Sequence, residues 1–302
     1  MKTQKTPDLK LSQPTPEFWR LRAVEGMNTV KPPRGLRFLY CTAIGRIFLH
    51  VCIARRAANI YAWYLNSFLS RRSIKKFIRQ NMIDTSEYIM EKFKSFNDFF
   101  KRKIRPECRP VDTDKNALIS PCDGKLTAFN IDGDSVFNVK GFDYSLKTLV
   151  QNEEIAKEFE GGICLIFRLT VSDYHRYIFF DGGGASDGGF IAGKLHTVQP
   201  TALEKRRVFT ENCREYTLLH TDNFGDALQV EVGAMFVGRI VNTGKKQFKR
   251  GDEKGWFEFG GSTVILVLKK ESAELDSEIF KNTLNGFETQ VKCGEKIGTK
   301  IT

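Results

Sequence analysis

The pattern of hydrophobic and polar positions changes near residue 95. Residues 36–94 have a helical pattern and contain no run of alternating β-branched residues. After residue 95, short apolar runs are separated by Gly or Asp, which is typical of strands joined by turns. The pattern therefore predicts an α+β protein, with a helical N-terminal part followed by a β-rich part.

The β-rich part has five clear strand candidates and two helix candidates. The strands are expected at residues 125–131, 135–139, 162–170, 227–241 and 256–268, and the helices near residues 146–159 and 272–284. Residues 1–35 are polar and proline-containing, which predicts a flexible lead-in. We therefore expect three parts, which are a lead-in (1–35), a helical segment (36–94) and a β-rich catalytic domain (95–302).

Length and composition are those of a globular protein. The chain has 302 residues, of which 41% are hydrophobic and 27% are charged. A chain of this size can bury a substantial core without disulfides. The seven cysteines are widely spaced and form no Cys-x-x-Cys pair or Cys/His cluster. A zinc site and a disulfide scaffold are therefore disfavoured, and a reducing compartment is expected.

The net charge of +11 comes from one segment. Residues 31–83 contain no acidic residue and eleven basic ones, which are Lys31, Arg34, Arg37, Arg46, Arg55, Arg56, Arg71, Arg72, Lys75, Lys76 and Arg79. The remainder is balanced, with 36 basic and 36 acidic residues. The basic segment therefore favours contact with a nucleic acid, a membrane surface or an acidic partner.

A membrane surface fits this segment best. Its longest uncharged run, residues 57–70, is shorter than the ~20 residues that a spanning helix needs. The polar first 20 residues have no apolar core of a secretory signal. Aromatic residues beside the arginines are typical of a segment lying on an anionic membrane: Phe38, Tyr40, Phe48, Tyr61, Trp63, Tyr64 and Phe68. The alternative is a helical hairpin packed on its own domain. Nucleic-acid binding is disfavoured, because no recognised binding motif accompanies the charge.

Four local motifs carry candidate chemistry. They are Phe99-Phe100-Lys101-Arg102-Lys103 leading to Arg109-Pro110-Val111-Asp112, then Ser120-Pro121-Cys122-Asp123-Gly124-Lys125, then Asp173-Tyr174-His175-Arg176, and last Phe257-Glu258-Phe259-Gly260-Gly261-Ser262-Thr263-Val264. Each also has a purely structural interpretation. These are, in order, a solvated basic face with two packed aromatic rings, a tight turn, a packed histidine, and a glycine bulge in a strand.

The Gly-Ser pair in the last motif allows a further reaction. The hydroxyl of Ser262 could attack the carbonyl of Gly261, and elimination from the resulting ester would leave a dehydroalanine that hydrolyses to a pyruvoyl group. This chemistry needs a base near Ser262 and a donor for the oxyanion. Asp123 and His175 are the titratable candidates.

In combination and order, the four motifs resemble those of the phosphatidylserine decarboxylases, which are self-processing pyruvoyl enzymes. The resemblance runs from about Ser95 to Gly298. It implies cleavage between Gly261 and Ser262, giving a β chain (1–261) and an α chain (262–302) that begins with the pyruvoyl group. It also implies that Asp123 is the acidic member of the processing triad. His175 matches the first histidine of the family's His-x-x-His pattern, which is associated with decarboxylation.

The second histidine of that pattern is replaced by Ile178. Isoleucine cannot accept a proton, so another group must activate Ser262. Two substitutes are open, because His175 could serve both steps, or His196 could reach the site from another strand. A third alternative is that the chain is a lipid-binding relative that is never processed.

The resemblance also implies a mechanism and a location. A Schiff base between the pyruvoyl group and the substrate amine would lose CO2, and His175 would supply a proton as general acid. Phosphatidylserine would become phosphatidylethanolamine, with no metal required.

The basic segment favours this lipid over a soluble amino acid, the alternative substrate. We expect a peripheral protein on the cytoplasmic side of the cell membrane, with homo-oligomer formation left open. The glycine-rich residues 181–189 are interpreted as a flexible loop beside the active site.

Overall fold

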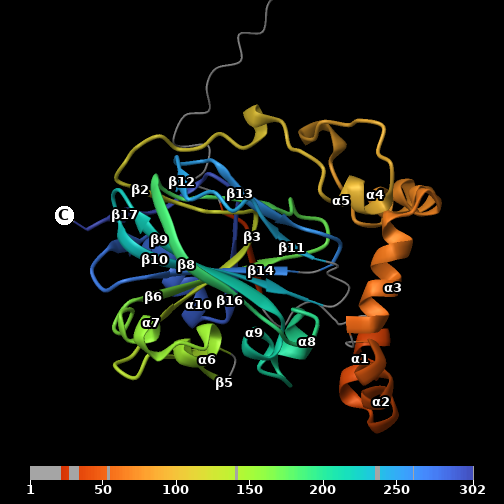
Figure 1. The fold of residues 1–302 in the computed structure, drawn as a ribbon, viewed down its shortest axis with the longest axis horizontal. Helices are drawn as coiled ribbons and strands as arrows, with labels where there is room; N and C mark the ends of the chain where they lie inside the picture. Colours follow the sequence, from red (N-terminus) through yellow and green to blue (C-terminus); the bar gives the residue numbers. More distant parts are fainter. Residues whose placement is uncertain are drawn as a thin grey trace, which may run out of the picture.

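The computed structural model describes residues 22–26, 34–52, 55–139, 142–234, 239–260 and 262–301. A helical N-terminal part lies along one side of a β-rich body (Figure 1). The predicted combination of a helical N-terminal part and a β-rich remainder is therefore confirmed. Residues 22–26 fall in the predicted lead-in but include a strand, and residues 1–21 and 27–33 lie outside the described residues.

Among the described residues, the largest sheet has nine strands and is antiparallel throughout. In spatial order its strands are β1 (Val24–Gly26), β16 (Phe287–Val291), β3 (Gly124–Asn130), β6 (Ile163–Leu169), β14 (Ser262–Leu268), β10 (Gly225–Gly233), β9 (Arg214–Thr221), β8 (Gly183–Ile191) and β12 (Gln247–Phe248). β14 is the central strand, and every residue in it is buried. Its continuous apolar sequence is typical of a strand that is covered on both faces.

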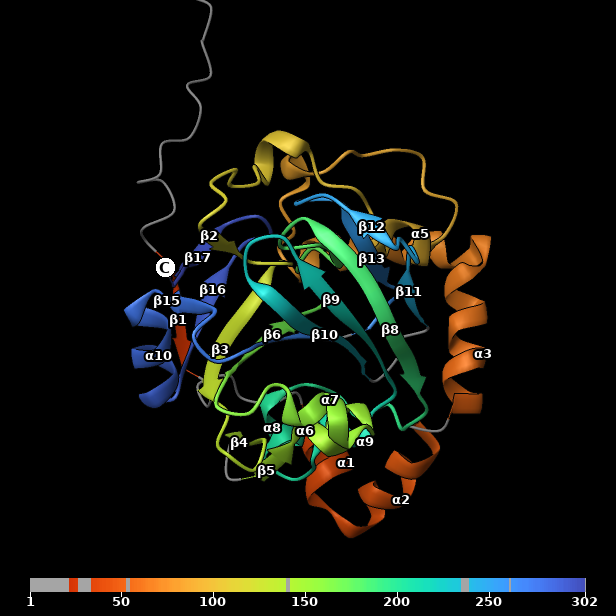
Figure 2. The same ribbon diagram turned by 60° about the vertical axis from the view of Figure 1, so that its left-hand side comes forward.

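Smaller sheets and short helices surround the large sheet (Figure 2). The smaller sheets are β11 (Ile240–Asn242) with β13 (Glu253–Phe257) and β7 (Arg176–Ile178), β15 (Ala273–Leu275) with β17 (Lys296–Lys300) and β2 (Ala117–Ile119), and β4 (Val136–Val139) with β5 (Phe142–Ser145). The helices of the body are α6 (Leu146–Val150), α7 (Glu153–Lys157), α8 (Pro200–Leu203), α9 (Val208–Glu211) and α10 (Ser277–Leu284). α10 packs on β3 and β16.

The topology brings two distant parts of the chain together. β6 and β14 are neighbours in the large sheet, with Ser262 opposite Leu169. Their chain continuations, β7 after β6 and β13 before β14, are neighbours in a smaller sheet. The β6–β7 connection and the β13–β14 connection must therefore lie side by side, although about 90 residues separate them in the sequence.

The N-terminal part is a series of short helices. They are α1 (Arg34–Cys41), α2 (Ala43–Cys52), α3 (Arg55–Asn66), η2 (Phe68–Ser73), α4 (Ile74–Gln80), η3 (Thr85–Glu87), α5 (Phe96–Phe100) and η4 (Pro106–Cys108). The start of α2 needs glycine at position 45, because a Cβ on Gly45 would lie 1.9 Å from the carbonyl oxygen of Phe38 in α1. Within the described residues, no helix has the length and apolar character needed to cross a membrane.

Several predicted elements are divided in the structure. The strand predicted over residues 256–268 is two strands, β13 and β14, in different sheets. The strand predicted over 227–241 likewise becomes β10 and β11. The helix predicted over 146–159 becomes α6 and α7, which are separated at Gln151, a residue in the left-handed region with a φ of 54°. The prediction of a flexible glycine-rich loop was wrong, because most of it forms β8, which is paired on both sides.

A buried ion pair supports the sheet across three strands. Arg168 on β6 reaches Glu288 on β16, which lies beyond β3. The guanidinium Nε donates to Glu288 Oε1 at 2.8 Å, and a second bond joins Nη2 to Oε2. Both side chains are only 7% exposed. A charge left unpaired at such a depth is strongly destabilising.

We predict that Glu288→Gln lowers the free energy of unfolding by about 3 kcal/mol, because Arg168 keeps its buried charge and loses its counter-charge. Urea titration of both chains in a Ser262→Ala background measures this. The matched control is Glu153→Gln, at an exposed ion pair with Lys147, and it should leave the midpoint nearly unchanged. Equal midpoints for both variants would contradict the prediction.

Candidate active site

The two neighbouring connections place His175 on Ser262. Ser262 is the first residue of β14 and is fully buried. Its Oγ lies 3.3 Å from Nδ1 of His175, a residue that immediately precedes β7. The backbone amide of Phe257 donates to the carbonyl of His175 at 3.0 Å, which ties the two connections together. Gly261 lies outside the described residues.

The tautomer of His175 follows from its second hydrogen bond. Nε2 lies 2.9 Å from the carbonyl oxygen of Thr170, which can only accept. Nε2 therefore carries the proton, and Nδ1 is left to accept the hydroxyl proton of Ser262. Asp173 holds this turn, because its Oδ2 accepts from the amide of Thr170 at 2.6 Å and from its hydroxyl at 2.9 Å. Burial raises the pKa of Asp173, with the nearby charge of Asp123 adding to the effect.

The surroundings of His175 keep its ring neutral. The ring is fully buried and lies against Phe100, with ring centroids 4.1 Å apart. Burial, together with the positive charge of Arg102, lowers the pKa of His175 to about 3. Arg102 is 2% exposed, donates to the carbonyls of Phe100 and Ser172, and lies over the ring of Tyr88. An imidazole in this setting accepts a proton only transiently at neutral pH.

Asp123 lies nearby in a different arrangement. Its carboxylate accepts two hydrogen bonds from Arg109, at 2.8 and 2.7 Å, and one from the amide of Cys293 at 2.9 Å. Arg109 also pairs with Glu87. Among the described contacts of Asp123, none joins it to His175 or Ser262. The structure therefore brings His175 and Ser262 together and leaves Asp123 paired with Arg109.

His196 is also placed away from the nucleophile. Its Nδ1 lies 3.2 Å from the hydroxyl of Tyr40, and its Nε2 is 3.4 Å from Glu211 without hydrogen-bond geometry. Burial lowers the pKa of His196 to about 4. The nearest link to Ser262 is indirect, because Asn212 donates to the carbonyls of both His196 and Gly233, the β10 partner of Ser262. His196 thus anchors α1 on the body through Tyr40.

The N-terminal helices reach the site through an aromatic cluster. Phe259, three residues before Ser262, packs against the other four members of what we call the Phe259 cluster: Tyr61, Phe77, Phe96 and Phe100. Phe100 in turn lies on the His175 ring. The helical part and the candidate catalytic pair are therefore in continuous contact.

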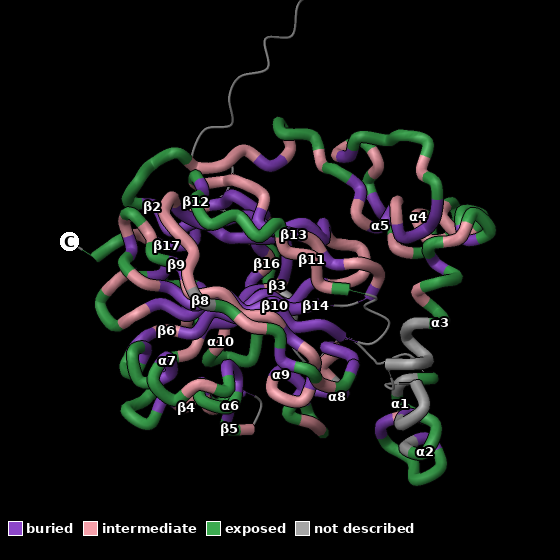
Figure 3. The backbone as a smooth tube through the Cα atoms, viewed as in Figure 1, coloured by how far each residue is buried: buried purple, intermediate pink, exposed green. Residues whose placement is uncertain are grey.

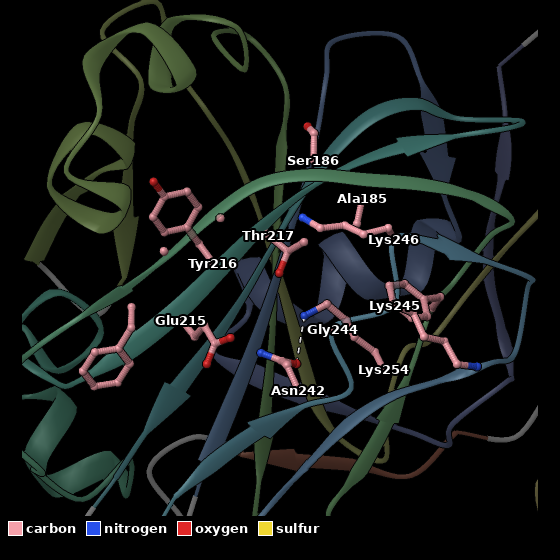
Figure 4. Close-up of a pocket in the computed structure, with 14 residues that line it drawn as sticks. Ala185, Ser186, Glu215, Tyr216, Thr217, Asn242, Gly244, Lys245, Lys246 and Lys254 are labelled. Atoms are coloured by element: carbon pink, nitrogen blue, oxygen red, sulfur yellow. Dashed lines mark hydrogen bonds between the residues drawn. The ribbon is translucent and has the colours of Figure 1, made fainter.

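A pocket of about 250 Å³ lies beside β8, on the face of the large sheet that bears Ser262 (Figure 4). Lys254 lines it and bonds Glu231 at 2.8 Å and Asn242 at 3.1 Å. Neither Ser262 nor His175 lines this pocket. The glycine-rich segment thus lines a pocket distinct from the candidate catalytic pair.

The sequence interpretation missed the role of the first motif. The structural interpretation of residues 99–103 placed Arg102 on a solvated basic face, but Arg102 is buried beside His175. Arg109, further along the same motif, is buried beside Asp123. The structure does confirm the packing of the Phe99 and Phe100 rings, which are fully buried.

The residues around Ser262 fit the formation of a pyruvoyl group. A buried hydroxyl faces a neutral imidazole nitrogen, so a proton acceptor lies where a serine nucleophile needs one. His175 can therefore accept the hydroxyl proton of Ser262.

Comparison with known proteins agrees with the motifs. Residues 96–299 match the family described as phosphatidylserine decarboxylase. The chain is 45% identical over 264 residues to phosphatidylserine decarboxylase proenzyme 2 of Clostridium acetobutylicum, covering 87% of this chain and 91% of that protein. Phosphatidylserine decarboxylase proenzymes of Clostridium perfringens and Clostridium novyi are 45% and 42% identical, covering 90% and 94% of this chain and 96% and 99% of theirs. The resemblance inferred from the motifs is confirmed, and the chain belongs to the phosphatidylserine decarboxylase family.

Proposed function

We propose that the protein cuts itself between Gly261 and Ser262 and then converts phosphatidylserine to phosphatidylethanolamine and CO2 at a membrane surface. The observation that carries this proposal is the 3.3 Å approach of Ser262 Oγ to Nδ1 of His175, in a member of this family. In this proposal Asp123 has a supporting role. Its ion pair with Arg109 and its hydrogen bond from the amide of Cys293 hold the chain at the start of β3.

Self-cleavage uses the groups of the site in sequence. Ser262 Oγ attacks the carbonyl carbon of Gly261, and its proton passes to His175 Nδ1. The C–N bond breaks, and the same proton moves to the freed amine of residue 262. Elimination transfers the Cα proton of residue 262 to the neutral Nδ1 of His175 and expels the carboxylate of Gly261, which can take that proton up. The remaining dehydroalanine takes up water and releases ammonia, which leaves the pyruvoyl group. His175 returns its proton readily, because the pKa of the buried ring is low.

One histidine then suffices for two steps. Ile178 is buried in the hydrophobic core, and its backbone amide donates to the carbonyl of Pro121. No proton acceptor is present at that position, so His175 takes over the activation of Ser262. In the mature protein, Nδ1 of His175 faces the same position, where it can accept a proton transiently and pass it on. The pyruvoyl group supplies the electron sink that decarboxylation of an amino acid head group requires.

The two chains remain associated after cleavage. β14 is bonded to β6 on one side and β10 on the other, while β16 is bonded to β1 and β3. Both strands belong to the α chain and all four neighbours to the β chain. Separation of the two chains would expose the apolar residues of the central strand to water, which costs free energy.

In this proposal the helical part provides the membrane contact, and exposed positions occur along it (Figure 3). Large apolar side chains are exposed along it: Ile44, Ile47, Phe48, Ile60, Trp63, Phe68 and Leu69. Trp63 is 76% exposed, whereas Leu65 on the same helix is buried against the Phe259 cluster. α3 is therefore apolar on its outer side as well as its inner side, which a helix facing only water would not require.

Basic side chains accompany this apolar surface. Arg71, Arg72, Lys75, Lys76 and Arg79 are all exposed on η2 and α4. Each basic residue near an anionic bilayer contributes ~1 kcal/mol of attraction. We therefore propose a peripheral position on the cytoplasmic side of the cell membrane. The Phe259 cluster connects the helices at the bilayer to the active site, so the site lies close to the membrane.

Ser262→Ala tests the function directly. We predict that wild-type protein yields two fragments and releases CO2 from phosphatidylserine vesicles, whereas Ser262→Ala stays a single 302-residue species and is inactive. Ser272→Ala, whose hydroxyl bonds only the carbonyl of Lys269 among the described contacts, should behave like wild type. Mass spectrometry and CO2 release are the measurements. An intact wild-type chain, or release of CO2 from soluble phosphoserine alone, would contradict the proposal.

The rate of self-cleavage should be insensitive to mild acid. A histidine with an ordinary pKa near 6.5 would be only about 3% neutral at pH 5, so its rate would fall about 30-fold. His175 stays neutral there, because its pKa is lowered to about 3. We expect the rate at pH 5 to lie within about twofold of the rate at pH 7.5 in chain freshly made by cell-free synthesis.

This pH experiment needs a stability control. The folded state binds fewer protons than the unfolded state, because the pKa of His175 is lowered on folding. Stability therefore decreases as the pH falls from about 6.5 toward 3. Circular dichroism at pH 5 shows whether the chain is still folded. A loss of rate centred near pH 6.5 in folded protein would exclude a buried, neutral His175.

Removing exposed apolar side chains should weaken membrane binding. We predict that Trp63→Ser and Phe68→Ser each reduce binding to vesicles containing phosphatidylserine at least tenfold, since insertion of each ring is worth about 1.5–3 kcal/mol. The control is Leu284→Ser on α10, where the side chain is 86% exposed on another element. Sedimentation with vesicles at low and high salt measures the effect. Equal binding of all three variants would contradict this membrane face.

A further inference from the structure

The chain just before the proposed cleavage bond is held by one buried side chain. The backbone amide of Phe259 donates to Oδ1 of Asn97 at 2.9 Å. Asn97 lies on α5 and is 2% exposed. Its Nδ2 donates to Oδ1 of Asn66 on α3 at 3.1 Å. The two ends of the Asn97 amide therefore have different partners, which fixes its orientation.

The ring of Phe259 is fixed by the same helices. Its centroid is 5.0 Å from those of both Phe96 and Phe100, in edge-on geometry. Phe77 and Tyr61 complete the cluster at 6.1 and 6.2 Å. Both the backbone and the side chain of Phe259 thus take their position from α3, α4 and α5.

The other side of the bond is fixed by the large sheet. Ser262 is paired with Leu169 on β6 and with Gly233 on β10. Only residues 260 and 261 lie between this point and Phe259. Gly260 has a φ of 144°, a conformation that side-chain-bearing residues rarely adopt. The segment that carries the bond is therefore short and anchored at both ends, which reduces the conformations that compete with attack.

We propose that Asn97 is a positioning residue for self-cleavage, an inference that rests on the proposed function. It touches neither Ser262 nor His175 among its described contacts, and acts through the backbone of Phe259. Without the Oδ1 acceptor, the amide of Phe259 loses its partner, and the anchored segment gains conformations in which Ser262 does not attack. The cleavage step then slows, although nucleophile and base are unchanged.

The test compares two substitutions of Asn97. Asn97→Leu has a similar volume but no acceptor, and we expect cleavage at least tenfold slower than in wild type. Asn97→Asp keeps an acceptor for the Phe259 amide, and we expect a rate within about threefold of wild type. The matched control is Asn81→Leu, in the same helical part, where the amide bonds only the carbonyl of Phe77 among its described contacts. It should cleave at the wild-type rate.

The measurement is the fraction of cut chain against time after cell-free synthesis. Thermal unfolding of the same variants in a Ser262→Ala background identifies loss of fold. A folded Asn97→Leu that is cut at the wild-type rate would overturn the inference, as would an Asn97→Asp that is as slow as Asn97→Leu. Wild-type chain that is never cut would instead overturn the proposed function. The two failures are therefore distinguishable.

Discussion

The pairing of β14 with β6 is the constraint on which the candidate site depends. It places Ser262 opposite the last residue of β6, and the chain beyond β6 turns immediately to present His175. The strands that continue from them, β7 and β13, are also paired with each other, in a second sheet. A nucleophile and a base that are 87 residues apart are thus held by four strands, and no flexible loop has to bring them together.

The helical part and the active site form one structure. Asn97 and the Phe259 cluster connect α3 and α5 to the segment before Ser262, and Phe100 lies on the ring of His175. The outer side of α3 carries the exposed rings that we assign to the membrane. In our proposal, the site is therefore adjacent to the bilayer that holds the phospholipid substrate.

The sequence was sufficient for the architecture and for part of the site. The apolar run predicted a strand over residues 256–268, and Gly-Ser chemistry made Ser262 and His175 candidates, because strand pattern and residue type are local properties. The division between β13 and β14 was not predictable, since apolar continuity does not show where a chain changes sheets. The pairing of Asp123 with Arg109, and the distance of His196 from Ser262, depend on tertiary contacts between remote segments. Ile178 left the base undecided, and the contact of His175 with Ser262 supports the first of the two substitutes.

The central claim is that His175 alone activates Ser262. The most direct measurement is the time course of self-cleavage for His175→Ala beside His196→Ala, followed by intact mass. We predict that His175→Ala remains a single uncut chain, because the hydroxyl loses its acceptor, and that His196→Ala is cut at the wild-type rate. Wild-type cleavage of a folded His175→Ala would contradict this assignment, and an uncut, folded His196→Ala would return the role of base to His196.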